Sequence, residues 1–348
     1  MVAGTKPAAT HGGMMPDVFS VGTAAAAHAT HARGAIPVGL DASGRMREIP
    51  VLICRGEADG PGLWINGATH GDKPEGALSI FKLFDELRPG GLRGTVVGVP
   101  AMNVPAFEAG KRGDPLDTFS YDMNRIYPGR PDGYPTERAA RAHWEAMRDT
   151  CDLQIAIHSG GEHSYLAHMI FASDNPPSLE LASAMGPQWD LVFRSGVGGA
   201  NPSSKIAERG KAGITVELGG NCRTLTADFH AVAEDLAGSY ANVMRHYGMF
   251  DGEARYAGRL RMGHQQALLA PASGMWVGSA DLPFETEIPA GTPLGRVYDL
   301  YGDVQAEVVA PADGVVFGLR SRPAVIAGEW CCFFGIIEEV RENPCAGR

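Results

Sequence analysis

Three residues that could bind a metal or move a proton each follow or end an apolar run of the sequence. His70 follows "GLWINGAT", His158 ends "DLQIAIH", and Glu217 lies in "AGITVELGG". Two imidazoles can bind Zn²⁺, and a nearby carboxylate can deprotonate a zinc-bound water, whose pKa the metal lowers to about 7. These residues predict a hydrolytic site in which His70 and His158 bind Zn²⁺ and Glu217 is the general base.

The stretch "NGATHGDKPEG", residues 66–76, departs from such a site at one position. A Glu three residues after His70 would complete a pair of metal ligands, but Lys73 stands there. A protonated Lys cannot bind a metal, and at ~4 Å and an effective dielectric near 20 it repels each unit charge of Zn²⁺ by about 4 kcal/mol. If a helix opens at Lys73, Asp72 lies about 100° from the ligand face and Glu75 about 200°. Asp72 is therefore the tentative third ligand.

Lys73 leaves several alternatives open. Glu75, or a carbamylated Lys73 that carries a carboxylate, could take the third metal position. The site could instead lack a metal and use Lys73 as the electrophile of a metal-free hydrolase. It could also belong to a metal-depleted binding or regulatory protein on the same scaffold.

A long segment without helical or strand period, residues 104–135, carries further polar side chains. It contains Arg112 in "AGKRGDP", and Asn124 and Arg125 in "YDMNRIYPG". A loop of this length inside a globular chain is usually functional. The guanidinium fork suits bidentate binding of a carboxylate or stabilisation of an oxyanion. The loop predicts a small-molecule substrate that carries a carboxylate.

The elements that position these residues alternate in type along the chain. Helical spacing of apolar residues predicts helices at 75–87, 135–150 and 226–249, with Thr136 as an N-cap, and strand-like runs lie between them. This order predicts an α/β fold with a mixed, mostly parallel sheet flanked by helices. Ligands of such sheets gather at the carboxyl ends of the strands.

The C-terminal quarter has a different pattern. "LAPASGMWVG" at 269–278 recurs as "VAPADGVVFG" at 309–318, among short β-branched runs and Gly/Pro turns. We expect a catalytic domain at 1–255, with an N-terminal arm at 1–34, and a small β-domain at 256–348 that resembles a hammerhead or barrel.

The composition limits the partners. The chain has 30 Lys and Arg against 40 Asp and Glu, a net charge of −10, which argues against nucleic acid or an anionic membrane as a partner. No apolar run is long enough for a membrane span, and the N-terminus has no secretory pattern. Six cysteines without CxxC spacing fit reduced thiols, so a cytoplasmic protein is expected. The sequence leaves a homo-oligomer open.

Other titratable residues are assigned to packing or to the surface. A single histidine is more often structural than catalytic, and a charged loop residue is usually solvated. The residues assigned in this way are His28, His31, Glu162, His163, His168 and His230.

Four motifs in order resemble the succinylglutamate desuccinylase/aspartoacylase family, relatives of zinc carboxypeptidases. They are "INGATHGDKPEG", "PAMNVPAFEAGKR…DMNRIYPGRPDGYPTERAA", "DLQIAIHSGG" and "ITVELGG". With the repeated β-segment, which looks like that of the bacterial members, the resemblance covers about residues 35–340. It implies a zinc carboxypeptidase-like fold and a deacylase that hydrolyses the linear amide of a small N-acyl amino acid or derivative.

The resemblance also implies roles for the matching positions. His70 and His158 match the zinc ligands, and Glu217 matches the general base that later protonates the leaving amine. Arg112 matches the residue that polarises the amide carbonyl. Asn124 and Arg125 match the pair that binds the substrate carboxylate. The family has a Glu ligand where this chain has Lys73.

Overall fold

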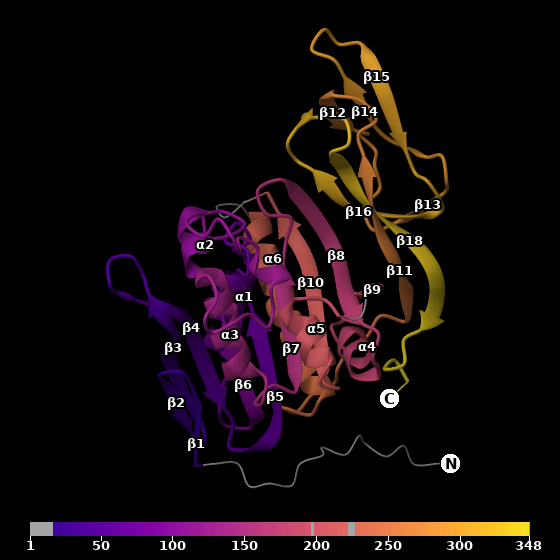
Figure 1. Cartoon of the computed structure of the whole chain (residues 1–348). Coiled ribbons are helices and arrows are strands. Elements are labelled where there is room, and N and C mark those ends of the chain that lie inside the picture. Colours follow the sequence, from indigo (N-terminus) through magenta and orange to yellow (C-terminus); the bar gives the residue numbers. More distant parts are fainter. Residues whose placement is uncertain (1–16, 196–197, 222–226, 348) are drawn as a thin grey trace.

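The structure is a computed structural model that describes residues 17–195, 198–221 and 227–347. The first 16 residues lie outside it. They are part of the predicted N-terminal arm, and the prediction that the N-terminus has no secretory pattern concerns these residues. Cys222 also lies outside the described residues. Figure 1 shows a body of strands and helices, from which a strand-rich C-terminal part extends.

The described helices lie mainly in the first two thirds of the chain. They are α1 (Glu75–Glu86), α2 (Val104–Ala109), the 3-10 helix η1 (Met123–Arg125), α3 (Pro135–Met147), α4 (Pro176–Ser183), α5 (Pro202–Ala207) and α6 (Ala227–His246). The strands are β1 (Val18–Val21), β2 (Ala24–Ala27), β3 (Thr30–Leu40), β4 (Met46–Arg55), β5 (Ala58–Asn66), β6 (Arg93–Val99), β7 (Leu153–His158), β8 (Ser164–Ser173), β9 (Leu191–Ser195), β10 (Ala212–Gly220), β11 (Arg259–Leu269), β12 (Gly274–Gly278), β13 (Glu287–Ile288), β14 (Pro293–Tyr298), β15 (Val304–Val309), β16 (Gly314–Arg320), β17 (Ala324–Val325) and β18 (Trp330–Glu342).

The predicted mostly parallel sheet flanked by helices is wrong. The main sheet has the order β13-β16-β18-β11-β9-β8-β10-β7-β5-β6-β4-β3, and seven of its twelve strand pairings are antiparallel. Strand β16 also pairs with β8, which closes β8, β9, β11, β18 and β16 into a mixed barrel of five strands. The alternation of apolar runs does not reveal this closure, because β8 and β16 are far apart in the sequence.

The strands that bear the predicted site are nevertheless parallel neighbours. β5 pairs with β7, and β7 pairs with β10, so the carboxyl ends of these strands meet at one edge. In this register His158 stands directly beside Glu217. The helices α1 and α6 pack together against β10 and its neighbours, and the Ser79 hydroxyl hydrogen-bonds the Tyr240 hydroxyl at 2.8 Å.

The predicted helix at 75–87 is confirmed as α1, with Ile80 and Leu83 buried. The helix predicted at 135–150 is α3, but its N-cap position is Tyr134 rather than Thr136, since Pro135 already starts the helix. The segment predicted as one long loop contains α2 and η1. Asn103 caps α2 by accepting a hydrogen bond from the Ala106 amide, a cap that the sequence analysis did not assign.

The C-terminal β-domain agrees with the prediction. Strands β12, β14, β15 and β17 form a four-stranded sheet of their own. A strand starts within each copy of the sequence repeat, β12 at Gly274 and β16 at Gly314. Strands β11, β16 and β18 continue into the main sheet. The boundary at 255/256 therefore stays a prediction. None of the described helices has the length and hydropathy to cross a membrane.

His168 links three parts of the fold. From β8, its Nδ1 lies 2.6 Å from a Glu285 carboxylate oxygen of the C-terminal part, and its Nε2 lies 2.6 Å from Asp235 of α6. Burial alone would lower the pKa of His168, but the hydrogen bonds with the Asp235 and Glu285 carboxylates raise it to about 9. The folded protein therefore favours the imidazolium.

This link predicts a pH-dependent stability. Because the pKa of His168 is raised on folding, its contribution is complete below the unfolded pKa near 6.5 and is lost as the pH rises through about 9. We expect the free energy of unfolding to fall by about 3 kcal/mol more in wild type than in His168→Gln between pH 6 and pH 10. Urea denaturation at both pH values measures it. The exposed His230→Gln serves as the control, and an equal fall in all three proteins would contradict the assignment.

Candidate functional site

His70 and His158 lie against each other at the carboxyl edge of the sheet. His70 follows β5, and its ring centroid is 4.9 Å from that of His158, the last residue of β7. The loop can take this path because Gly71 packs on α2; a Cβ at that position would lie 2.0 Å from the Ala106 carbonyl oxygen. Both histidines are buried.

Both rings are neutral at pH 7. Burial lowers the pKa of His70 to about 4 and lowers the pKa of His158 well below its usual value, and the Lys73 charge contributes to both shifts. The His70 Nε2 lies 2.9 Å from an Asp122 carboxylate oxygen, to which it donates. The lone pair of His70 is therefore on Nδ1, which, like His158 Nε2, is buried without a hydrogen-bond partner among the described residues.

Glu217 faces this pair from the neighbouring strand β10. The residue is partly buried, and its Oε2 has no hydrogen-bond partner in the part of the chain that the structure describes. Burial raises the pKa of Glu217, although the charges of Lys73 and Arg112 act in the opposite direction. A carboxylate with a raised pKa is a better general base near neutral pH.

Asp122 organises the site, and the sequence analysis did not single it out. Its Oδ1 accepts from His70 and, at 2.9 Å, from the Asn124 amide, while Oδ2 accepts from Arg112 at 2.9 and 3.1 Å. Burial alone would raise the pKa of Asp122, but the His70 hydrogen bond and the charges of Arg112 and Arg125 lower it. Its place two residues before Asn124 in "YDMNR" is the one signal that could have found it.

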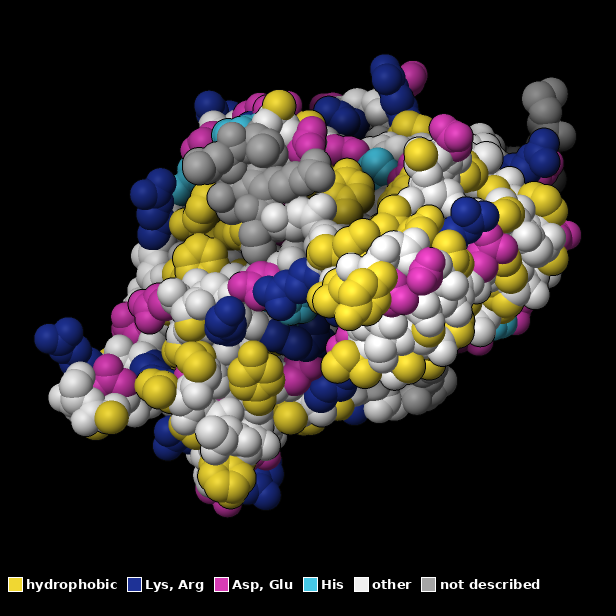
Figure 2. All heavy atoms as spheres, turned by 90° about the horizontal axis from the view of Figure 1, so that it is seen from above, with side chains coloured by type: hydrophobic (Ala, Val, Ile, Leu, Met, Phe, Trp, Pro, Cys, Tyr) yellow, Lys and Arg dark blue, Asp and Glu magenta, His cyan; other side chains and the backbone are white. Residues whose placement is uncertain are grey.

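Arg112, Asn124 and Arg125 all line a cleft of about 1000 Å³ together with the two histidines and Glu217. Arg125 is exposed to the cleft, and the Asn124 side-chain oxygen is buried and accepts no hydrogen bond from any described residue. Figure 2 shows Lys and Arg side chains gathered in the middle of this face. The cationic lining residues are Lys73, Lys111, Arg112, Arg125, Arg194 and Arg322.

Residues of the C-terminal part form one wall of the cleft. Arg322, Trp330 and Phe333 line it, and Arg322 forms an ion pair at 3.2 Å with Glu162 of the main body. The cleft is therefore bounded on a side where a long substrate would otherwise extend. The net positive lining suits a small anion.

Lys73 lies inside the site. It is 9% exposed, and its backbone amide donates to the His70 carbonyl at 3.2 Å in the turn that precedes α1. Its charge contributes to lowering the pKa of each of the ionisable groups around it, which are His70, Glu75, His158 and Glu217. Within the described ranges, no hydrogen bond or ion pair holds the Lys73 ammonium.

The acidic candidates for a third metal ligand are directed elsewhere. An Asp72 oxygen accepts from the Glu162 amide at 3.4 Å, and a Glu75 oxygen accepts from the Ser159 hydroxyl at 2.7 Å. Among the described residues, neither carboxylate combines with the two histidines into a group whose donor atoms all lie within 4.8 Å of one another. Two neutral imidazoles with unused lone pairs suit Zn²⁺, but a set with a buried ammonium in the third position does not. The residues present do not fit a three-ligand zinc site.

Comparisons with known proteins give a consistent result. A family profile described as succinylglutamate desuccinylase/aspartoacylase catalytic domain matches residues 59–246. The chain is 30% identical over 310 residues to the N-alpha-acetyl-L-2,4-diaminobutyric acid deacetylase of Halomonas elongata, covering 85% of this chain and 86% of that protein.

Solved structures of related proteins are similar over most of their length. The product-bound ectoine utilization protein EutE (DoeB) of Ruegeria pomeroyi has a TM-score of 0.74 and 25% identity, over 88% of this chain and 95% of that one. A succinylglutamate desuccinylase from Silicibacter has a TM-score of 0.76 and 24% identity, over 88% of this chain and 95% of that one, a likeness of fold.

Proposed function

Because the chain belongs to the succinylglutamate desuccinylase/aspartoacylase family, we propose that it hydrolyses the amide bond of a small N-acyl amino acid, with Glu217 as general base and Lys73 as an electrophilic group. The family membership confirms the prediction from the four motifs. The observation that carries the proposal is the burial of Lys73 beside the catalytic candidates. Its charge acts to lower the pKa of Glu217 and of both histidines.

Glu217 is placed to activate water. Its carboxylate takes a proton from a water molecule as the oxygen forms a bond to the amide carbonyl carbon. The same proton then passes to the amide nitrogen as the C–N bond breaks, so the products are an amine and a carboxylic acid, which loses its proton to solvent at neutral pH. The raised pKa of Glu217 favours both transfers, because the group can accept and return a proton near neutral pH.

Lys73 and Arg112 are placed to stabilise the oxyanion that forms on the carbonyl oxygen. Cations that already stand in the site stabilise developing charge with little reorganisation. Asp122 positions Arg112 through the two hydrogen bonds at 2.9 and 3.1 Å and holds His70 through the other oxygen. The neutral rings of His70 and His158 offer lone pairs that can accept hydrogen bonds from the water or from Lys73.

Zinc was predicted for this cleft from the residue types and from the resemblance. In a chain with a Glu at position 73, a metal would supply the Lewis acid for the carbonyl. Here the donor set lacks that third ligand, and we propose that Lys73 takes over the positive charge. The prediction of Asp72 as a ligand has no support from the geometry, since its carboxylate is directed at the 161–162 loop.

The substrate proposal follows from the charges of the cleft. Arg125 and Asn124 are placed to bind a carboxylate, and the C-terminal wall limits its size. The Halomonas relative is named for an N-acetylated diamino acid, so that class heads the panel of substrates to test. N-acetyl, N-succinyl and N-formyl derivatives of diamino and acidic amino acids complete the panel.

The direct test uses protein freed of metal by a chelator and follows release of the amine. Turnover of one class of N-acyl amino acid, abolished in Glu217→Gln, supports the proposal. Saturable binding of such compounds without release of an amine would instead indicate the alternative, a binding or regulatory protein on this scaffold.

Replacement of Arg125 tests the carboxylate site. We expect Arg125→Met to raise KM by about 10- to 100-fold with little change in kcat, because a charge-assisted hydrogen bond contributes about 1.5–3 kcal/mol in ground state and transition state alike. Arg130→Met is the matched control, since Arg130 lies in the same loop but outside the cleft and pairs with Asp132 and Glu137. A fall in kcat with unchanged KM would contradict this role.

A further inference from the structure

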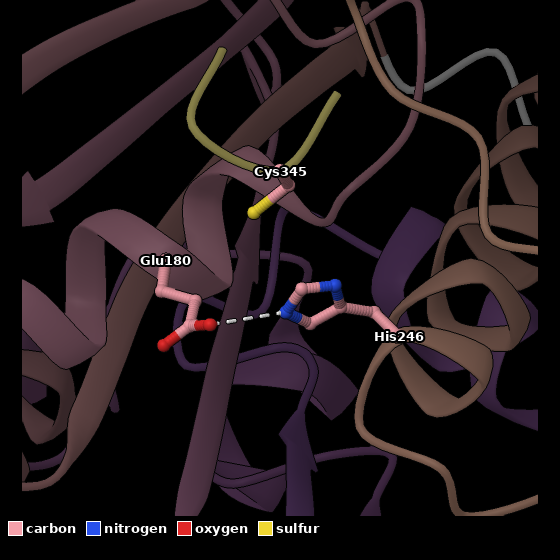
Figure 3. Close-up of side chains that lie close together, drawn as sticks. All are labelled: Glu180, His246 and Cys345. Carbon is pink, nitrogen blue, oxygen red and sulfur yellow. Dashed lines mark ion pairs between the residues drawn. The ribbon is translucent and has the colours of Figure 1, made fainter. Parts of the chain in front are cut away.

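A second group of donor atoms lies away from the cleft, where the C-terminal segment meets α4 and α6. Glu180 of α4, His246 at the end of α6 and Cys345 each offer one donor atom, and these atoms lie within 4.8 Å of one another. Of the residues that the structure describes, no others form such a group. Figure 3 shows the Glu180 carboxylate directed toward the His246 ring and the Cys345 sulfur directed toward the space between them.

The two ring nitrogens of His246 face different partners. Its Nδ1 lies 3.0 Å from the Tyr256 hydroxyl, and its Nε2 lies 3.4 Å from a Glu180 carboxylate oxygen. A metal-binding histidine usually uses one ring nitrogen for the metal and the other for an oxygen that fixes the ring. Nε2 is therefore the nitrogen presented to Glu180 and Cys345.

The Cys345 backbone is fixed by contacts that do not involve these donors. The buried Asn343 side chain accepts a hydrogen bond from the Cys345 backbone amide at 2.8 Å and donates one to the Ser183 carbonyl of α4 at 3.2 Å. The Asn343 backbone amide donates to the Gly258 carbonyl at 3.1 Å. The thiol is thus carried by a turn that is anchored to α4. The side chains of Cys345 and His246 are shielded from solvent, and that of Glu180 is 29% exposed.

From this geometry we infer a zinc site at Glu180, His246 and Cys345 that joins the C-terminal segment to α4 and α6. A sulfur, an imidazole nitrogen and a carboxylate oxygen are the donors that zinc takes in proteins, at about 2.3, 2.0 and 2.0–2.2 Å. A tetrahedral ion with these bond lengths separates its donors by roughly 3.3–3.7 Å. The separation of 3.4 Å between His246 Nε2 and the Glu180 oxygen already falls in this range, and the separations from the Cys345 sulfur are at most 4.8 Å. A water would complete the four ligands.

The inference is independent of the function proposed for the cleft. We expect near-stoichiometric zinc after equilibrium dialysis, measured by elemental analysis, and an absorbance band of Co²⁺ bound to thiolate when cobalt replaces zinc. Zinc should also raise Tm, because it binds the folded chain. His70→Ala tests the cleft and should leave zinc content unchanged.

The ligand variants decide the outcome. Cys345→Ser should remove the cobalt–thiolate band, and Glu180→Gln, a change at a partly exposed side chain that should leave the fold intact, should weaken zinc binding at least tenfold. Cys332→Ser is the matched control for replacing a buried thiol. Absence of zinc binding in wild type, or zinc that is lost in His70→Ala but retained in Cys345→Ser and Glu180→Gln, would overturn the inference.

Discussion

Replacing Glu217 by Gln is expected to lower kcat for amide hydrolysis by about 10³-fold, within the range of 10²–10⁴ for loss of a general acid–base. The amide keeps the size of the side chain but cannot take a proton from water or return one to the leaving amine. KM should change little, since substrate binding is proposed for Arg125 and Asn124 and not for Glu217. Steady-state kinetics with the best substrate of the panel measures both constants.

The control for this variant is Glu234→Gln, because Glu234 lies on α6, is 66% exposed, and pairs with Lys82 outside the cleft. Its kcat should match that of wild type. A Glu217→Gln protein that retains full kcat would show that another group moves the proton, and the proposed mechanism would then be wrong.

Replacing Lys73 by Met is expected to lower kcat by about 10²–10³-fold, the effect typical of losing one group that stabilises an oxyanion. Met fills similar space but carries no charge. The Lys73 charge lowers the pKa of Glu217, so its removal should also move the acidic limb of the pH–rate profile to higher pH. A purely structural role for Lys73 would not produce that shift.

Two comparisons sharpen this prediction. Lys82→Met changes a lysine on the outer side of the same helix α1 and should leave both kcat and the pH profile unchanged. Lys73→Glu restores a carboxylate three residues after His70, so elemental analysis should find a gain of zinc relative to wild type. If Lys73→Met turns over substrate as wild type does, Lys73 is not the electrophile.

That these candidate residues meet in one cleft was largely predictable from the sequence, because their signals are local. His70, His158 and Glu217 follow or end apolar runs, and parallel strands bring such ends together. The structure places Arg112 and Arg125 in the same cleft, as the long loop suggested. Asp122 was missed because a single Asp in a loop has no pattern, and its role depends on contacts with His70 and Arg112.

The sheet was predicted less well, for a physical reason. Periodicity identifies strands but not their partners, and the pairing of β16 with β8 joins segments about 150 positions apart in the chain. Strands β11 and β18 form a long antiparallel pair that enters the main sheet beside β9. The prediction did not pair these segments with the main sheet and so missed the closed barrel.

The cluster at Glu180, His246 and Cys345 was equally invisible in the sequence. Its donors come from two helices and the C-terminal turn, with no spacing that resembles a metal motif. Only the packing of that turn on α4 brings the thiol to the histidine.

The central claim is that Lys73, and not a metal, provides the positive charge beside Glu217. The most direct test measures kcat of wild type after exhaustive dialysis against a chelator, and again after Zn²⁺ is added back. We expect the same kcat in both states, with the kcat of Lys73→Met lowered by about 10²–10³-fold in both. A loss of activity on dialysis that zinc restores in wild type, and also in Cys345→Ser, would contradict the claim and would assign the electrophile to a metal bound at His70 and His158.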